Sequence, residues 1–267
     1  MKKYLAIFRI RFVNALQYRT AALAGVATQF AWGFMVIFSF SAFYAANPAA
    51  FPMEFSALSS YIWMQQAFLM LFMLWGWDNN IFSAITTGSI AYEIVRPVDL
   101  YNRWFTQNVA NRLAASMLRC APVLIVAFLL PPPYNLILPP DIGQLFLFLF
   151  SVALSLGVVV SFAMLIYISV FYTMSPMGIR LISMILAEFL MGGVVPLPFF
   201  PDGIRRVVEL LPFASMQNTP LLIYTGNIAG AGALRAIALQ VFWIITLVII
   251  GRLMMRHALK RVVVQGG

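Results

Sequence analysis

Charged side chains are scarce in this sequence, at 9% of its 267 residues. A soluble domain carries about 25% charged residues, because its water-facing surface needs them. Hydrophobic residues instead make up 63% of the chain, and the mean hydropathy is +0.91. This balance excludes a soluble enzyme, a disordered tail and a fibrous repeat, and it predicts a polytopic membrane protein.

The residue types that carry catalysis or bind metals are also scarce. His257 is the only histidine and Cys120 the only cysteine, which excludes a histidine cluster, an HExxH motif and an intramolecular disulfide. The eight carboxylates are scattered along the chain, and no G-x-x-x-x-G-K-[ST] sequence is present to cradle a nucleotide phosphate. We therefore expect no catalytic residues, no metal site and no bound cofactor in this chain.

The dominant feature of the sequence is a series of long apolar runs, such as residues 145–160. A helix needs about 20 apolar residues to cross the hydrocarbon core of a bilayer, whereas the strands of a barrel would alternate apolar and polar residues. The predicted fold class is therefore an all-α integral membrane protein with six transmembrane helices in a single domain, 1–267. The predicted elements are a helix at the membrane surface over residues 1–19 and spans at about 21–45, 58–77, 113–130, 142–170, 178–195 and 233–255.

The distribution of basic residues predicts the topology and the kind of surface that the chain meets. With six spans, 14 of the 17 Lys and Arg residues fall on one side, and only Arg205, Arg206 and Arg235 fall on the other. Basic residues are retained on the cytoplasmic side, so we expect both termini to be cytoplasmic. Because these charges lie at the ends of apolar runs, the net charge of +9 indicates lipid headgroups rather than nucleic acid.

A polar stripe runs along the predicted third span and its N-terminal extension. On a helix its members fall within about 140° of one face; they are Asn108, Asn111, Arg112, Ala115, Ser116 and Arg119. Arg112 can reach the inner interface, but Arg119 lies deeper, where an arginine costs about 3 kcal/mol or more. The only acid at a comparable depth is Glu188. We expect these two residues to form a structural pair, with substrate contact and a proton relay as the alternatives.

The connection between the second and third spans contains a segment with mixed character. Residues 83–95 are too polar to cross a bilayer, yet they contain several apolar side chains. Gly88 permits a turn, Pro97 ends a short helix, and Asp99 is spaced to pair with Arg103. Such a compact amphipathic element suits docking into a groove of another protein. A surface loop is the alternative.

The last predicted external connection contains two short helices. Asp202 is placed to cap the first, which has apolar residues on one face and Arg205 and Glu209 on the other. Thr219-Pro220 is expected to start the second helix and Gly226 to end it. A loop lying on the lipid surface is the alternative.

The chain resembles the ABC-2-type permeases, in particular their small six-span bacterial branch. The residues that carry the resemblance are Gly88, Ser89, Ile90, Glu93, Arg96 and Pro97 in the first connection, Pro196, Pro198, Pro201, Pro212 and Pro220 in the external connection, and Gln265-Gly266-Gly267 at the C-terminus. The resemblance implies that the first set forms a cytoplasmic coupling helix that docks on an ATPase. It also implies that the external helices form a re-entrant hairpin, which closes the outer end of the translocation path.

The same resemblance implies the partners and the location. The chain is expected to be the transmembrane subunit of an ATP-binding-cassette transporter, an exporter, in the bacterial cytoplasmic membrane. Separate ATPase subunits would bind ATP and Mg, and a second copy or a paralogous permease would complete the path.

Two other functions remain open from the sequence. A secondary transporter could use Arg119 and Glu188 to couple substrate to an ion, although we find no inverted repeat between residues 21–130 and 142–255. A membrane enzyme acting on lipid would need a cluster of acids, histidines or metal ligands at one interface, which is missing.

Overall fold

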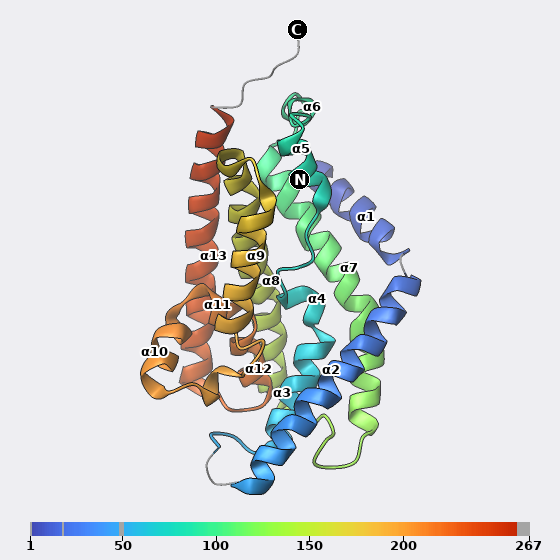
Figure 1. The fold of residues 1–267 in the computed structure, drawn as a ribbon, viewed down its shortest axis with the longest axis vertical. Coiled ribbons are helices and arrows are strands. Elements are labelled where there is room, and N and C mark those ends of the chain that lie inside the picture. Colours follow the sequence, from blue (N-terminus) through green and yellow to red (C-terminus); the bar gives the residue numbers. More distant parts are fainter. Residues whose placement is uncertain (1, 18, 48–50, 261–267) are drawn as a thin grey trace.

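The computed structural model describes residues 2–17, 19–47 and 51–260 (Figure 1). Over these ranges the chain is helical and contains no β-strand. In chain order the elements are α1 (Lys2–Leu16), α2 (Arg19–Ala46), α3 (Phe55–Ala67), α4 (Leu69–Phe72), α5 (Asn79–Thr86), α6 (Ala91–Ile94), α7 (Leu100–Leu129), α8 (Ile142–Thr173), α9 (Pro176–Leu190), the 3-10 helix η2 (Leu197–Phe199), α10 (Asp202–Leu210), α11 (Pro212–Met216), α12 (Asn218–Tyr224) and α13 (Gly230–Leu259). The predicted all-α fold class is confirmed.

Four helices among the described residues are long and apolar enough to cross a membrane. They are α2, α7, α8 and α13, which coincide with the spans predicted at 21–45, 113–130, 142–170 and 233–255. Carboxylates define two of their starts, because Asp99 accepts from the Asn102 amide at 2.8 Å and Asp141 accepts from the Gln144 amide at 2.8 Å. Each carboxylate thereby satisfies a helix amide that has no partner within the helix.

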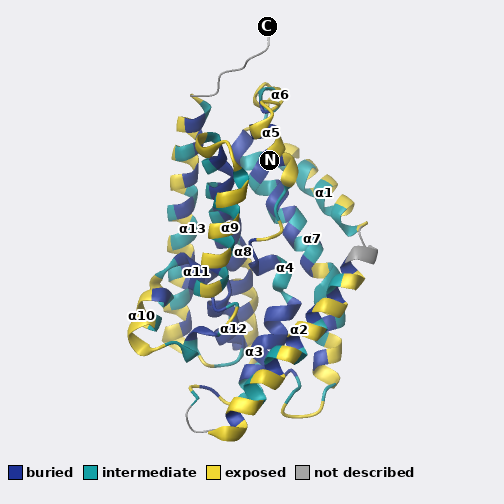
Figure 2. Ribbon diagram, viewed as in Figure 1, coloured by how far each residue is buried: buried dark blue, intermediate teal, exposed yellow. Residues whose placement is uncertain are grey.

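The span predicted at 58–77 differs from the structure, because it is not one helix. Helix α3 is interrupted at Phe68, α4 is a single turn, and Met73–Asp78 is not helical. Every residue of α3 from Leu58 to Ala67 is buried, and the helix packs among α2, α7 and α12 (Figure 2). Non-helical backbone at membrane depth is tolerated where surrounding protein satisfies its polar groups.

The span predicted at 178–195 is also shorter in the structure. Helix α9 starts with Pro176 and ends at Leu190. Beyond it Gly192 adopts a φ of +82°, and the Gly193 amide donates to the Glu188 carbonyl at 2.8 Å. This left-handed turn favours glycine and ends the helix. Only Ala187 of α9 is buried, so the helix lies at the periphery, against α8.

The arrangement of the helices brings distant parts of the chain to one end of the molecule (Figure 1). Lys3 donates to the Pro97 carbonyl at 3.1 Å, and Arg180 donates to the Asn79 side chain at 3.3 Å. Arg252 near the end of α13 donates to the Asn102 side chain at 2.9 Å. The starts of α1, α7 and α9 and the end of α13 therefore surround the α5–α6 region.

The expected surface helix over residues 1–19 corresponds to α1, which packs along α7. Residues 1 and 18 lie outside the described residues, as does the C-terminal Gln265-Gly266-Gly267 motif. No residue of α1 is fully buried, and Leu5, Ile10 and Val13 are exposed.

Candidate functional site

The first connection folds as two short helices around a glycine turn. The Asp78 side chain accepts from the Asn80 amide at 3.1 Å and thereby caps α5. Gly88 then adopts a φ of +76°, a left-handed conformation that disfavours side chains with a Cβ. The turn expected at Gly88 is present, and it separates α5 from the single helical turn α6.

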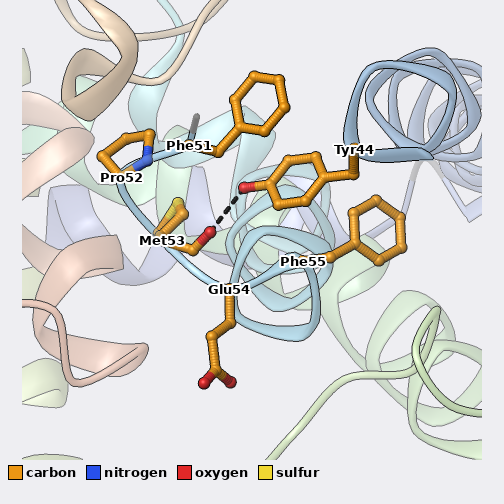
Figure 3. A pocket seen from close by; sticks show the side chains of 6 residues that line it. All are labelled: Tyr44, Phe51, Pro52, Met53, Glu54 and Phe55. Carbon is orange, nitrogen blue, oxygen red and sulfur yellow. Dashed lines mark hydrogen bonds between the residues drawn. The ribbon is translucent and has the colours of Figure 1, made fainter. Parts of the chain in front are cut away.

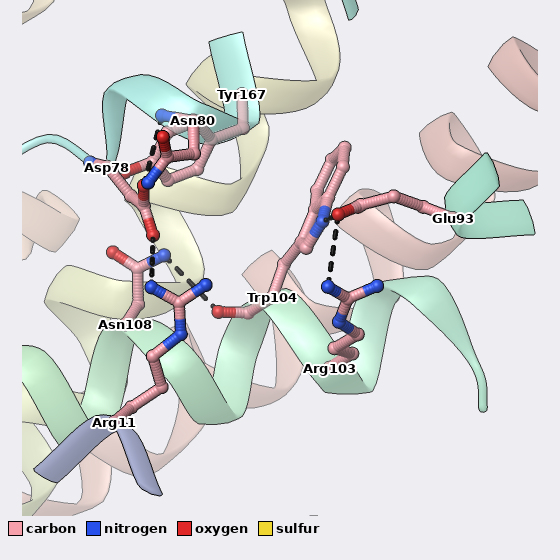
Figure 4. Close-up of polar contacts among 8 residues, drawn as sticks. All are labelled: Arg11, Asp78, Asn80, Glu93, Arg103, Trp104, Asn108 and Tyr167. Atoms are coloured by element: carbon pink, nitrogen blue, oxygen red, sulfur yellow. Dashed lines mark hydrogen bonds and ion pairs between the residues drawn. The ribbon is translucent and has the colours of Figure 1, made fainter. Parts of the chain in front are cut away.

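Glu93 faces the bundle rather than the surrounding solvent. Its carboxylate accepts from Arg103 at 3.0 Å and from the Trp104 indole at 2.9 Å (Figure 4). Trp104 is fully buried, so these bonds hold α6 against the start of α7. The expected pairing of Asp99 with Arg103 is wrong, because Asp99 caps α7 instead.

Three large apolar side chains are exposed at α6 and directly after it. Ile90 is buried, whereas Tyr92 and Val95 are 75% and 81% exposed and Ile94 is also exposed. Ser89, Arg96 and Pro97 are exposed beside them. We call Tyr92, Ile94 and Val95 the exposed apolar tip; α6, which carries it, protrudes beyond the main bundle in Figure 1.

A group of polar residues lies beneath this region, between α1, α7 and α8. The Asp78 carboxylate lies 3.7 Å from Arg11, and the Asp78 amide donates to the Tyr167 hydroxyl at 2.8 Å (Figure 4). Asn108, which is buried, donates to the Trp104 carbonyl at 3.2 Å. Arg11 of α1 and the Tyr167 hydroxyl of α8 thus hold the point at which the chain enters α5.

The polar stripe of α7 faces protein. Arg112 is 3% exposed and donates to the main-chain carbonyls of Leu71 and Met73. Ser116, one turn further, is also buried. Arg112 therefore contacts main-chain groups of a neighbouring broken helix, a class of partner that a sequence does not reveal.

The expected pair of Arg119 and Glu188 is wrong. Arg119 lies against Gly25 of α2, where a Cβ would come within 2.6 Å of the guanidinium carbon. Glu188 lies on α9 beside Gly193, and no ion pair joins the two residues. Helices α7 and α9 both pack on α8, but the Arg119 side chain points to α2 instead.

The external helices divide into an exposed part and a buried part. Pro196 and Pro198 flank the start of η2, and Pro201 precedes α10. Asp202 is the first residue of α10 and makes no capping bond, so the expected cap is wrong; its carboxylate pairs with Arg205 at 2.9 Å. Burial raises the pKa of the Glu209 carboxyl in the same helix, and the nearby Arg205 opposes that rise.

The buried part comprises α11 and α12, in which every residue is buried. Pro212 occupies the first turn of α11, and Pro220 lies inside α12, which starts at Asn218 rather than at the expected Thr219-Pro220 pair. Gly226 follows α12 with a φ of +77°, as expected for its end. These two helices form part of the core.

Glutamine side chains, which the sequence analysis did not select, hold this buried part in place. Gln144 of α8 donates to the carbonyls of Ile223 and Ile228, each at 2.8 Å. Gln217 donates to the Gly192 carbonyl at 3.1 Å, and Gln65 of α3 donates to the Gly193 carbonyl at 2.7 Å. Their signal in the sequence is only that they are amides within apolar runs, which indicates hydrogen bonds between helices.

A cavity of about 510 Å³ lies at the far end of α2 from the α5–α6 region (Figure 3). The residues that line it are Tyr44, Phe51, Pro52, Met53, Glu54 and Phe55. Tyr44 donates to the Met53 carbonyl at 2.7 Å, and its ring stacks on Phe51 with centroids 4.3 Å apart. This cavity therefore lies between the end of α2 and the start of α3, and its aromatic rings pack on one another.

Within the described part of the chain, no group of three His, Cys, Asp or Glu side chains is placed to hold a metal ion. A comparison with curated proteins gives no match to the chain. A family model described as "ABC-2 family transporter protein" matches residues 30–266. This match covers most of the sequence, including the α5–α6 region and the external helices. The chain is therefore a multi-pass membrane protein that belongs to the ABC-2 transporter family.

Proposed function

We propose that this chain is the transmembrane subunit of an ABC exporter and that its α5–α6 region docks on a separate ATPase. The observation that carries the proposal is the exposed apolar tip, Tyr92, Ile94 and Val95, which is anchored to α7 through Glu93. Apolar side chains gathered at a protruding end indicate a surface that a partner covers. A groove on an ATPase would fit a short element of this kind.

The orientation that we propose places this end in the cytoplasm. The basic residues gathered there, among them Lys3, Arg180 and Arg252, follow the rule that positive charge is retained inside. Both termini would then be cytoplasmic, and the membrane would be the bacterial cytoplasmic membrane. The external helices α10 and α12, with α11 between them, would lie in the outer half as the re-entrant hairpin and close the outer end of the path.

The proposed partners follow from family membership. The ATPase subunits would bind ATP and Mg, and a second copy of the chain or a paralogous permease would complete the path. The secondary-transporter alternative loses its basis, because Arg119 and Glu188 do not meet.

The test is whether the tip binds an ABC ATPase encoded in the same genome. The two proteins are co-expressed, purified through a tag on the permease and assayed for bound ATPase and for ATP hydrolysis. Val95→Asp places a charge on the tip and is expected to weaken the complex by roughly tenfold or more, as for a central interface residue. Leu138→Asp is the matched control, because Leu138 is 69% exposed in the loop at the opposite end. Equal amounts of bound ATPase in both variants would overturn the proposal.

A further inference from the structure

The break after α4 leaves main-chain carbonyls without helical partners inside the molecule. Helix α4 ends at Phe72, and the chain runs without helix from Met73 to Asp78 before α5 begins. We call Met73–Asp78 the link. The last carbonyls of any helix lack amide donors and carry a partial negative charge. Leu71, Phe72, Met73 and Leu74 are buried, so these carbonyls need partners from the protein.

Arg112 supplies that partner from α7. One guanidinium nitrogen donates to the Met73 carbonyl and lies 3.4 Å from the Leu71 carbonyl. The side chain is 3% exposed, and no carboxylate within 4 Å neutralises it. The guanidinium is therefore a tethered cation whose acceptors are the carbonyls at the end of a broken helix.

The other end of the link is held separately. The Asp78 amide donates to the Tyr167 hydroxyl at 2.8 Å, and the Asp78 carboxylate lies 3.7 Å from Arg11. The Trp77 ring packs edge-on against the Tyr167 ring with centroids 5.6 Å apart. Between these two fixed ends, Trp75 is 50% exposed and Gly76 is also exposed. The link is thus clamped at both ends, and in its middle the Trp77 amide donates to the Trp75 carbonyl at 2.9 Å.

The link connects the α5–α6 region, through α4, with α3, in which every residue from Leu58 to Ala67 is buried. Helix α3 reaches the external helices through Tyr61, which donates to Asn218 at 3.2 Å, and through Gln65, which donates to the Gly193 carbonyl at 2.7 Å. A displacement of α5 can reach those contacts only if the link keeps its conformation and moves together with α5.

We propose that Arg112 is a positioning residue that makes the link transmit movement between the α5–α6 region and α3. Its guanidinium holds the end of α4 against α7, so that α3, α4 and the link move together. This inference rests on the proposed function, in which an ATPase moves the α5–α6 region. A loose link would leave the ATPase bound but would disconnect it from the outer half.

The first measurement is hydrogen exchange of the full-length chain in lipid nanodiscs, without any ATPase. Arg112→Ala is expected to speed exchange roughly 10- to 100-fold in peptides covering the link and α4, because one charge-assisted bond is lost. Guanidinium ion at millimolar concentration should restore slow exchange, since it can occupy the same carbonyls as the missing side chain. Methylammonium, which lacks the planar fork of donors, should restore less.

Arg119→Ala is the matched control, because Arg119 lies on the same helix and rests against Gly25 instead of the link. It should leave exchange of the link unchanged. Tyr167→Phe is a second, milder variant that removes only the acceptor of the Asp78 amide, and it should loosen the link at that end. Exchange that rises throughout the protein in Arg112→Ala, or that guanidinium does not slow, would overturn the proposal.

The second measurement is ATP hydrolysis by the complex with its ATPase. Arg112→Ala should bind as much ATPase as the wild type, yet hydrolysis per complex should fall several-fold and recover with guanidinium ion. Wild-type hydrolysis in Arg112→Ala would overturn the role of Arg112 while leaving the proposed function intact. If the wild-type chain itself binds no ATPase, the proposed function fails, and this inference fails with it.

Discussion

The side-chain amide of Gln240 on α13 donates to the main-chain carbonyl of Ser215 on α11 at 2.9 Å. The same amide group donates to the Ser155 hydroxyl at 3.0 Å, and its oxygen accepts from the Ser151 hydroxyl at 2.9 Å. One buried side chain therefore ties α11 to both α8 and α13. Inside a bilayer, where no water competes, such bonds hold backbone that is not part of a spanning helix.

Replacing Gln240 by leucine should destabilise the protein, because it keeps most of the volume and removes every polar contact. We expect a loss of about 1–2 kcal/mol, the upper range for a hydrogen bond between membrane helices. The loss is measured as a lower midpoint of thermal unfolding in detergent. Gln17→Leu is the control, since Gln17 is exposed. An equal unfolding midpoint in the two variants would contradict a stabilising role for the Gln240 hydrogen bonds.

Two glycines of α2 should respond differently to the same substitution. A Cβ on Gly33 would lie 2.7 Å from the Trp63 ring, which is fully buried, whereas a Cβ on Gly25 would meet the flexible end of Arg119. Alanine gains up to about 1 kcal/mol over glycine in a helix, but overpacking costs about 1–3 kcal/mol. Gly33→Ala should therefore lower the unfolding midpoint, and Gly25→Ala should leave it nearly unchanged. If Gly25→Ala lowered the unfolding midpoint more than Gly33→Ala, the Trp63 ring would have room to move away from the added methyl group.

The long spans could be predicted from the sequence, and the partners of the polar residues could not. Helices α2, α7, α8 and α13 follow from length and apolar composition alone. Arg112 binds main-chain carbonyls, which every residue has and no sequence marks. Arg119 lies against a glycine of α2 rather than beside an acid, and charge counting along the sequence does not show which helix an arginine faces. The break between α3 and α4 could not be predicted for a similar reason, because the carbonyls at the end of α4 are bound by Arg112 of another helix.

The proposed orientation predicts which thiols a membrane-impermeant reagent can reach. In a Cys120→Ser background, Ser89→Cys lies in the exposed turn before α6, and Leu138→Cys lies in the exposed loop before α8. The first should be labelled in inverted membrane vesicles only, and the second in intact cells only. Both positions are exposed, so a difference in labelling reports the side of the membrane and not burial. Labelling of Ser89→Cys in intact cells would show that the orientation is the reverse of the proposed one.

Glu93 is expected to act by fixing the exposed apolar tip rather than by touching a partner. Its two oxygens accept from Arg103 and from the Trp104 indole. Glu93→Gln keeps the size but turns one acceptor into a donor, so that either Arg103 or Trp104 loses its partner. An unsatisfied buried group costs about 1–3 kcal/mol, and this cost should appear locally. Hydrogen exchange should become faster over residues 88–97 while the spans stay protected.

Glu93→Gln also distinguishes a residue that anchors the exposed apolar tip from one that contacts the ATPase directly. If Glu93 only anchors, Glu93→Gln should weaken ATPase binding in proportion to the local opening, and Trp104→Phe, which removes the indole donor alone, should show a smaller effect of the same kind. Glu54→Gln changes an exposed acid at the opposite end. It should alter neither ATPase binding nor hydrogen exchange over residues 88–97. Reduced binding with no change in exchange would mean that Glu93 contacts the ATPase directly. That result would require a donor of the ATPase to reach the carboxylate, whose oxygens have acceptor sites beyond the two that Arg103 and Trp104 occupy.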